Sequence, residues 1–260
     1  MIPNWPDPLR RILDGLTIQP VLTGRSGATV FRFDTGLFLK ITPVSKDPDP
    51  GASLLTEAEK LKWMRAAGAP VAEVLEALSV DGVEYLLTRA VPGVDASQLP
   101  SVDDSVGGAI ARALKQLHGL PIAGCPFDQS LDRKIPQAFH RLEQGLVDLD
   151  DLDGEREGWD AARLRRSLEE TRPQTEDLVL CHGDLCLPNV LLAGGVVTGF
   201  VDVGRAGIAD RWQDLALMLR SLDSADNPQF DGCAEAFLRS YGVGPDRDRQ
   251  QFYCLLDEFF

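Results

Sequence analysis

A single stretch in the second half of the chain constrains its fold and chemistry more than any other feature. It contains His182-Gly183-Asp184, then Asn189 five residues after that aspartate, and Asp202 follows in a short apolar run. An aspartate can accept the proton of an attacking hydroxyl, while an asparagine and a second aspartate can hold Mg²⁺ against phosphates. The spacing is typical of phosphoryl transfer from a nucleoside triphosphate, with Asp184 as base and Asn189 and Asp202 as metal ligands.

Two departures from the protein-kinase pattern narrow the interpretation. Protein kinases carry His-Arg-Asp in the catalytic loop and Asp-Phe-Gly at the second aspartate. In this chain Gly183 replaces the arginine and Val203 replaces the phenylalanine. These differences favour a kinase of small molecules. We interpret His182 as a structural support of the catalytic loop and not as the general base.

A lysine upstream of the motif suits a nucleotide site. Lys40 lies in the apolar segment Leu37–Ile41, where a buried ammonium is costly unless it is paired. We expect it to contact the α- and β-phosphates of ATP and a carboxylate of the following helix. Glu57 is the natural partner, because it shares a helix face with Leu54 and Leu61. Lys40 and Glu57 therefore join Asp184 among the candidate catalytic residues.

Other candidate nucleotide contacts come from a loop and a hinge. The loop Gly24–Thr29 lies between two predicted strands, and Ser26 with nearby amides is placed to touch the β-phosphate. The hinge residues Arg89 and Val91 can offer main-chain groups to adenine. Phe38 is either a stacking face for adenine or part of the core.

Hydrophobic patterns and turn residues divide the chain into two parts. The first is predicted to contain strands at residues 21–33, 36–42, 71–78 and 83–88, with a helix from about Leu54 that Gly68 ends. The second is predicted to contain helices at residues 106–120, 131–147, 161–170, 210–222, 230–241 and 245–259, with short strands around the motif.

This order of elements predicts an α+β, two-lobe protein-kinase-like fold. We expect a small β-rich N-terminal lobe for nucleotide binding at residues 1–88 and a hinge at 89–95. A larger, mainly helical lobe at 96–260 would carry catalysis and bind the substrate.

The charge and the cysteines limit the partners of the protein. The 260 residues include 40 acidic and 26 basic ones, and the formal net charge of −14 argues against nucleic acid and anionic membranes as partners. The five cysteines are scattered and form no Cys-x-x-Cys pair. With no signal peptide or membrane helix in view, we expect a cytoplasmic protein, and a monomer is favoured.

Several stretches resemble the aminoglycoside 3′-phosphotransferases. They are the segment Cys181–Leu192, the run Gly199–Ala216 and the ending Leu255–Phe260, and the resemblance extends from about Arg10 to the end. It implies transfer of the γ-phosphate of ATP, with Mg²⁺, to the 3′-hydroxyl of kanamycin- and neomycin-like antibiotics. The consequence would be antibiotic resistance in the bacterial cytoplasm.

An acidic loop supports a cationic substrate. Between Val147 and Gly158 six acidic residues are opposed only by Arg156. Such a loop is usually just solvated, but a polyamine needs carboxylates that face it. The resemblance implies that Arg205 and Arg220 order the carboxylates around the substrate. These arginines, the acidic loop and the chain end supply the candidate substrate residues. These are Asp151, Asp153, Glu155, Arg205, Arg220, Asp257, Glu258 and Phe260.

The chain end is predicted to dock on the large lobe, because Leu255, Leu256, Phe259 and Phe260 are too apolar for a solvated tail. The antibiotic spectrum stays open. Some relatives carry an acid where Ser221 or Ser224 stands in this chain.

Two alternatives to an antibiotic kinase remain at this point. One is a kinase of another small metabolite, such as choline or homoserine. The other is a kinase-like module that binds a cation without catalysis. The complete set of Lys40, Asp184, Asn189 and Asp202 argues against the second, because each loses its purpose in a mere binder.

Overall fold

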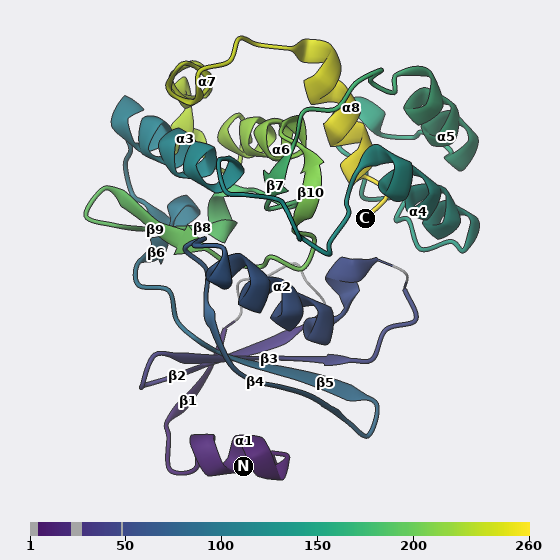
Figure 1. Cartoon of the computed structure of the whole chain (residues 1–260). Coiled ribbons are helices and arrows are strands. Elements are labelled where there is room, and N and C mark those ends of the chain that lie inside the picture. The colour runs from purple at the N-terminus through teal and green to yellow at the C-terminus, as the bar shows by residue number, and fades with distance from the viewer. Residues whose placement is uncertain (1–4, 22–27, 48) are drawn as a thin grey trace.

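The structure is a computed structural model that describes residues 5–21, 28–47 and 49–260. Its smaller lobe is built on an antiparallel sheet of five strands in the order β1-β2-β3-β5-β4 (Figure 1). The strands are β1 (Ile18–Val21), β2 (Thr29–Phe33), β3 (Leu37–Pro43), β4 (Glu73–Val80) and β5 (Val83–Arg89). Residues 22–27, with the candidate Ser26, lie outside the described part of the chain.

Two helices cover opposite sides of this sheet. Helix α1 (Asp7–Leu13) lies at the end of the molecule that is far from the large lobe, and α2 (Leu54–Ala66) lies between the sheet and that lobe (Figure 1). Leu37 and Leu39 of β3 share a core with α1. Because side chains alternate along a strand, Phe38 and Lys40 face the other side, toward α2 and the large lobe.

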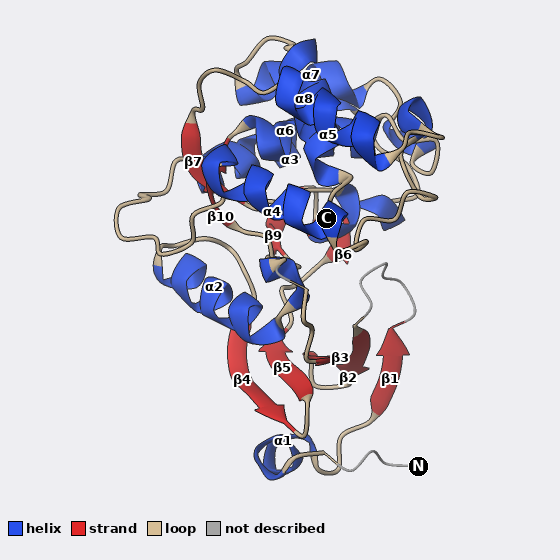
Figure 2. Cartoon of the chain, turned by 90° about the vertical axis from the view of Figure 1, so that its right-hand side faces the viewer, coloured by secondary structure: helices blue, strands red, loops and turns tan. Residues whose placement is uncertain are grey.

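The larger lobe is mainly helical (Figure 2). Its helices are α3 (Asp104–His118), α4 (Leu131–Glu143), α5 (Ala161–Glu170), α6 (Trp212–Leu222), α7 (Cys233–Tyr241) and α8 (Arg247–Asp257). Its short strands are β6 (Val94–Asp95), β7 (Leu178–Cys181), β8 (Val190–Ala193), β9 (Val196–Phe200) and β10 (Gly207–Asp210). Strand β7 pairs with β10, and β6, β8 and β9 form a second small sheet. The expected α+β fold with two kinase-like lobes is confirmed.

One continuous core joins α2 to the large lobe. Leu61 and Met64 of α2 belong to the same buried cluster as Leu114 of α3, Phe237 of α7 and Leu256 of α8. The helix that carries Glu57 is therefore anchored to both lobes. Burial of this apolar surface is the main favourable contribution to holding the lobes together.

Several predicted boundaries differ from the structure. The helix predicted from residue 210 begins at Trp212, because Asp210 pairs with Leu178 in a β-ladder and its side chain accepts a hydrogen bond from the Trp212 amide. The helix predicted to reach residue 147 ends at Glu143, just before Gly145 adopts a positive φ of 68°.

Two further differences lie near short elements. The helix predicted from residue 230 begins at Cys233, after Gly232 with a φ of 81° and a separate turn of 3₁₀ helix at Pro228–Phe230. Helix α1 was not predicted, since its seven residues are too short for a clear periodic pattern. Every helix in the described ranges is too short or too polar to traverse a lipid bilayer.

Candidate active site

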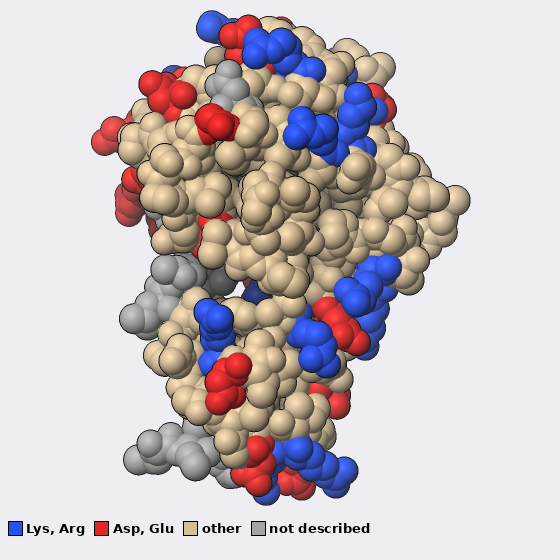
Figure 3. Space-filling view, turned by 90° about the vertical axis from the view of Figure 1, so that its left-hand side faces the viewer, with Lys and Arg blue, Asp and Glu red and all other residues tan. Residues whose placement is uncertain are grey.

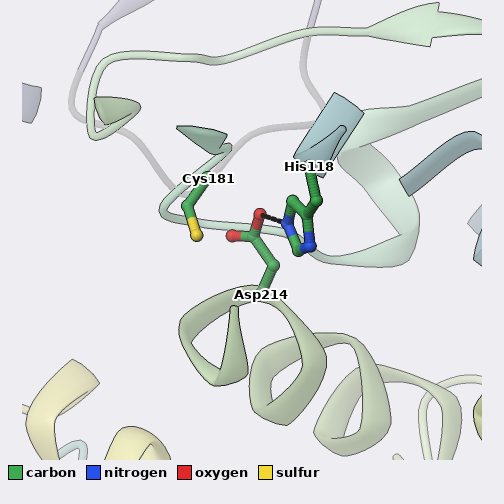
Figure 4. Close-up of side chains that lie close together, drawn as sticks. All are labelled: His118, Cys181 and Asp214. Carbon is green, nitrogen blue, oxygen red and sulfur yellow. Dashed lines mark hydrogen bonds and ion pairs between the residues drawn. The ribbon is translucent and has the colours of Figure 1, made fainter. Parts of the chain in front are cut away.

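The catalytic loop is held by one buried carboxylate. Asp214 of α6 accepts hydrogen bonds from the main-chain amides of His182 at 2.7 Å and Gly183 at 2.8 Å. It also pairs with His118 Nε2 at 2.9 Å (Figure 4). Burial alone would raise the pKa of Asp214, but the His118 contact and the hydrogen bonds lower it below the usual value. The carboxylate is therefore charged and fixes the loop that precedes Asp184.

The cluster of His118, Cys181 and Asp214 in Figure 4 has donor atoms within 4.8 Å of one another, as a metal site would. Both ring nitrogens of His118 are engaged, however, one by Asp214 and the other by the Tyr241 hydroxyl at 2.7 Å. The Cys181 thiol donates to the main-chain oxygen of Asp210 at 3.3 Å. The cluster is accordingly a hydrogen-bonded support of the catalytic loop.

Gly183 cannot be replaced without moving the chain. Its φ is 87°, and a Cβ at this position would lie 2.1 Å from the main-chain oxygen of Arg205. Only glycine avoids both the strain and the clash. This contact explains why the arginine of protein kinases is absent here, and it joins the catalytic loop to the loop after Asp202.

His182 has the supporting position expected from the sequence. Its Nε2 donates to the main-chain oxygen of Val201 at 2.8 Å, and its Nδ1 accepts from the Asp184 amide at 3.3 Å. The ring is fully buried and both nitrogens contact the main chain. It is therefore not available as a base for a substrate hydroxyl.

Asp184, the expected general base, has a carboxyl with a raised pKa. Burial raises the pKa of its carboxyl to about 6, and the negative charge of Asp257 adds to this increase. Arg205 and His182 act in the opposite direction. A base that titrates near neutral pH is well matched to accept a proton from a hydroxyl.

The residues expected to hold a metal ion lie next to each other. The main-chain oxygen of Asn189 accepts a hydrogen bond from the Val201 amide at 3.1 Å, which places Asn189 beside Asp202. Asn189 Nδ2 donates to the main-chain oxygen of Asp184 at 2.9 Å, so its amide oxygen is left as a ligand atom. Asp202 has a φ of 62°, a strained backbone conformation that is common at functional sites. A carboxylate and an amide oxygen suit Mg²⁺.

The small lobe supplies an ion pair that contacts Asp202. Lys40 contacts Glu57 at 2.8 Å, as the sequence predicted, and also Asp202 at 2.7 Å. Burial would lower the pKa of the Lys40 ammonium, but these two carboxylates raise it above its ordinary value. Lys40 thus carries a positive charge where the small lobe meets Asp202 of the large lobe. Figure 3 shows a narrow hollow between the two lobes on one face of the molecule.

The other nucleotide candidates lie along the same side. Phe38 is half-buried on the face of β3 that also presents Lys40, and Val91 packs against the main core. The side chain of Arg89 pairs with Glu73 at 2.9 Å. The Arg89 side chain is thus engaged by an exposed carboxylate, while its main chain lies at the end of β5 where the hinge begins.

Two arginines bring part of the predicted substrate site together. Arg220 contacts Asp153 at 3.1 Å and Asp257 at 2.5 Å. Arg205 lies 3.8 Å from Asp257 and donates to the main-chain oxygen of Phe260 at 2.5 Å. These five residues form a charged cluster whose Asp257 raises the pKa of Asp184.

The remaining substrate candidates are placed differently. Glu258 pairs with Arg156 at 3.0 Å, and its pKa is raised to about 7 by burial and by the charge of Asp153. Asp151 is exposed, and Glu155 lines a separate hollow beside Trp159. In the described ranges, neither Asp151 nor Glu155 hydrogen bonds to an arginine of the charged cluster.

The predicted docking of the chain end is confirmed. Phe259 is fully buried, and its main-chain oxygen accepts a hydrogen bond from Arg141 Nε at 2.5 Å. The Lys134 ammonium lies 4.8 Å from the centre of the Phe260 ring. The end of the chain lies beside α4 in Figures 1 and 2.

Sequence reasoning missed several residues of the site. Asp214 and His118 lie far from the motif in the chain, and Lys134 and Arg141 belong to a helix that was predicted only as a helix. For Asp214 the available signal was the segment Trp212–Ala216, which is part of the resemblance to known proteins. The others carry no local signal.

Asp184 on a hydrogen-bonded loop, the Lys40–Glu57 pair and the neighbouring Asn189 and Asp202 form the arrangement that is typical of two-lobed phosphotransferases. Residues 17–253 match the model of a family described as "Phosphotransferase enzyme family". An aminoglycoside 3′-phosphotransferase of Streptomyces fradiae is 44% identical over 91% of this chain and 92% of its own. A streptomycin 3″-kinase of Streptomyces griseus is 38% identical over 91% and 90%.

Solved structures agree. The crystal structure of a type VIII aminoglycoside 3′-phosphotransferase has a TM-score of 0.87 at 44% identity and covers 97% of each chain. A Streptomyces rimosus aminoglycoside phosphotransferase, solved with ADP and streptomycin, has a TM-score of 0.79 at 31% identity, over 96% of this chain and 95% of that one. The chain belongs to the aminoglycoside 3′-phosphotransferase family, as its motifs indicated.

Proposed function

We propose that the protein transfers the γ-phosphate of ATP to the 3′-hydroxyl of kanamycin- and neomycin-type aminoglycosides and thereby confers resistance. The observation that carries this proposal is that Asp257, which two arginines hold in place, is near enough to Asp184 for its charge to raise the pKa of that carboxyl. A polycationic sugar that binds to these carboxylates would bring its hydroxyl to the base. The ADP-bound relative supports ATP as the co-substrate.

Each residue of the site has a part in this reaction. Lys40, paired with Glu57, would bind the α- and β-phosphates, and Phe38 with the main chain of Arg89 and Val91 would bind adenine. Asn189 and Asp202 would hold Mg²⁺, which neutralises phosphate charge when bound. Asp184 orients the hydroxyl and accepts its proton. Ser26 remains a candidate phosphate contact.

The substrate side rests on the charged cluster and its acidic surroundings. Asp153 and Asp257 would pair with ammonium groups of the antibiotic, while Arg205 and Arg220 keep these carboxylates in position. Asp151, Glu155, Glu258 and the end of the chain at Phe260 would supply further contacts. Long-range attraction between this acidic protein and a polycation also favours binding.

We propose the same division of labour for the lobes as the sequence indicated. Residues 1–88 would bind the nucleotide, 89–95 would act as a hinge, and 96–260 would carry catalysis and the antibiotic site.

We also propose a cytoplasmic monomer. All five cysteines lie in the described ranges and are free thiols, which suits a reducing compartment. The net charge of −14 disfavours nucleic acid as a partner.

The relation to a streptomycin 3″-kinase supports a second candidate, a kinase that phosphorylates a different hydroxyl. ATP consumption should therefore be measured with kanamycin, tobramycin, streptomycin, choline and homoserine. We expect turnover with kanamycin. Tobramycin, which lacks the 3′-hydroxyl, should bind but not turn over. Efficient transfer to tobramycin or streptomycin would contradict the 3′ assignment, and turnover of choline alone would contradict an antibiotic substrate.

The raised pKa of Asp184 predicts a pH dependence. The base must be deprotonated to act, so activity is present above its pKa of about 6 and is lost as the pH falls through that value. The expected result is a decline of kcat/KM for kanamycin that approaches about tenfold per pH unit below this point. Circular dichroism at each pH checks that the protein stays folded. A flat profile down to pH 5 would contradict Asp184 as the base.

A further inference from the structure

Between β3 and α2 of the small lobe, Asp47 and residues 49–52 contact the large lobe beside the charged cluster. The carboxylate of Asp49 is 3.1 Å from Arg205, and Asp47 pairs with Arg141. The Asp49 side chain is buried, with 6% of its surface exposed. These interlobe ion pairs have no part in the site as described above.

The main chains of the two lobes also meet at this point. A Cβ on Gly204 would lie 3.1 Å from the Cα of Gly51, and a Cβ on Gly51 would lie 2.9 Å from the Arg205 side chain. Lys60 of α2 adds a hydrogen bond to the main-chain oxygen of Gly204 at 2.5 Å. The small lobe thus packs tightly against the loop that follows Asp202.

Arg205 connects this contact to the substrate side. The same guanidinium that binds Asp49 lies 3.8 Å from Asp257 and donates to the main-chain oxygen of Phe260. If Asp49 moves away, Arg205 has only its large-lobe partners left. It would then neutralise Asp257 more completely, and that carboxylate would attract an ammonium group less strongly.

The chain places Asp49 between the two nucleotide residues of the small lobe. Lys40 lies in β3 before it, and Glu57 lies in α2 after it. A shift that bound phosphates impose on β3 and α2 can therefore reach Asp49 from either side.

We propose that Asp49 is a positioning residue that couples nucleotide binding to aminoglycoside binding through Arg205. This inference rests on the proposed function and concerns the same site. Nucleotide binding fixes the position of the small lobe, and Asp49 then holds one side of the Arg205 guanidinium. Asp257, which stays paired with Arg220, keeps more of its negative charge for an ammonium group of the antibiotic. By linkage, the antibiotic must favour nucleotide binding by the same factor.

The test measures kanamycin affinity by calorimetry with and without a non-hydrolysable ATP analogue and Mg²⁺. In the wild-type protein the analogue should raise kanamycin affinity about fivefold or more. Asp49→Asn removes the charge, while Gly51→Ala displaces the Arg205 side chain without changing charge. In both variants the analogue should raise kanamycin affinity by less than about twofold. The affinity for the analogue alone should stay within about threefold of wild type. The double variant should be no worse than either single one, because both act through Arg205.

Asp34→Asn is the matched control, because it makes the same charge change in an exposed turn of the small lobe. It should keep the full analogue-dependent increase in kanamycin affinity. The proposal would be overturned if this increase survived in both Asp49→Asn and Gly51→Ala, or if the wild type did not show it.

A second measurement separates this proposal from the proposed function. If the wild type binds no kanamycin, the antibiotic assignment fails, but hydrogen exchange needs no antibiotic. The amides of residues 203–206 should then exchange about tenfold faster in Asp49→Asn than in the wild type or Asp34→Asn. Unchanged exchange there would show that Asp49 does not position the loop.

Discussion

Replacing Asp184 by asparagine is expected to lower kcat for kanamycin phosphorylation by about 10²-fold or more. The amide has nearly the same shape but cannot accept the proton of the 3′-hydroxyl. The hydrogen bonds that hold the loop come from main-chain groups of His182, Gly183 and Asp184 itself, so they remain. Affinity for the ATP analogue and for kanamycin should therefore stay within a few-fold of wild type. Steady-state kinetics and calorimetry measure the two quantities.

The Asp34→Asn variant controls for the loss of one negative charge and should keep normal turnover. Near-normal kcat in Asp184→Asn would remove Asp184 from the role of base. If the affinity for kanamycin or for the ATP analogue fell strongly together with kcat, Asp184 would instead be assigned to binding.

Replacing Asp214 by asparagine is expected to have the largest effect on stability. Its carboxylate accepts two main-chain amides of the catalytic loop and a contact from His118, all in a fully buried position. An amide would turn its NH₂ group toward at least one of these donors. Leaving a buried donor unpaired costs about 1–3 kcal/mol, and more for charged partners. At roughly 2–4 °C per kcal/mol, the melting temperature should fall by several degrees.

Activity should also fall in this variant at temperatures where it is still folded, because the loop that carries Asp184 has lost its support. Melting curves and kcat at low temperature measure the two effects. Glu235→Gln, which removes an exposed ion pair with Arg239, is a control that should change little. Unchanged stability and kcat in Asp214→Asn would show that the carboxylate does not support the loop.

Parts of the site could be predicted because they depend on short-range rules. The pairing of Lys40 with Glu57 follows from strand alternation and helix periodicity, which place both side chains on facing surfaces. The docked chain end follows from the apolar character of its last residues, and Phe259 is indeed fully buried. The spacing from Asp184 to Asn189 is local, so it could be recognised without a structure.

Other parts could not be predicted, because their partners are far apart in the chain. The pairing of Glu258 with Arg156 of the acidic loop joins residues about 100 positions apart, and no local pattern indicates it. Nothing in the pattern around Asp49 indicates that an arginine more than 150 residues later would bind it. Helix α1 was missed because it is stabilised by packing on the sheet more than by its own short sequence.

By itself, the sequence determined the chemistry and the class of fold: the identities and spacings of Asp184, Asn189 and Asp202 belong to phosphoryl transfer, and the order of strands and helices belongs to two lobes. Only the tertiary structure decided which charges meet. It set Arg205 between Asp49 and Asp257, and it brought the Arg205 main chain so close to Gly183 that no side chain fits there. Local propensity depends on neighbours in the chain, whereas the pairing of buried charges depends on how distant elements pack.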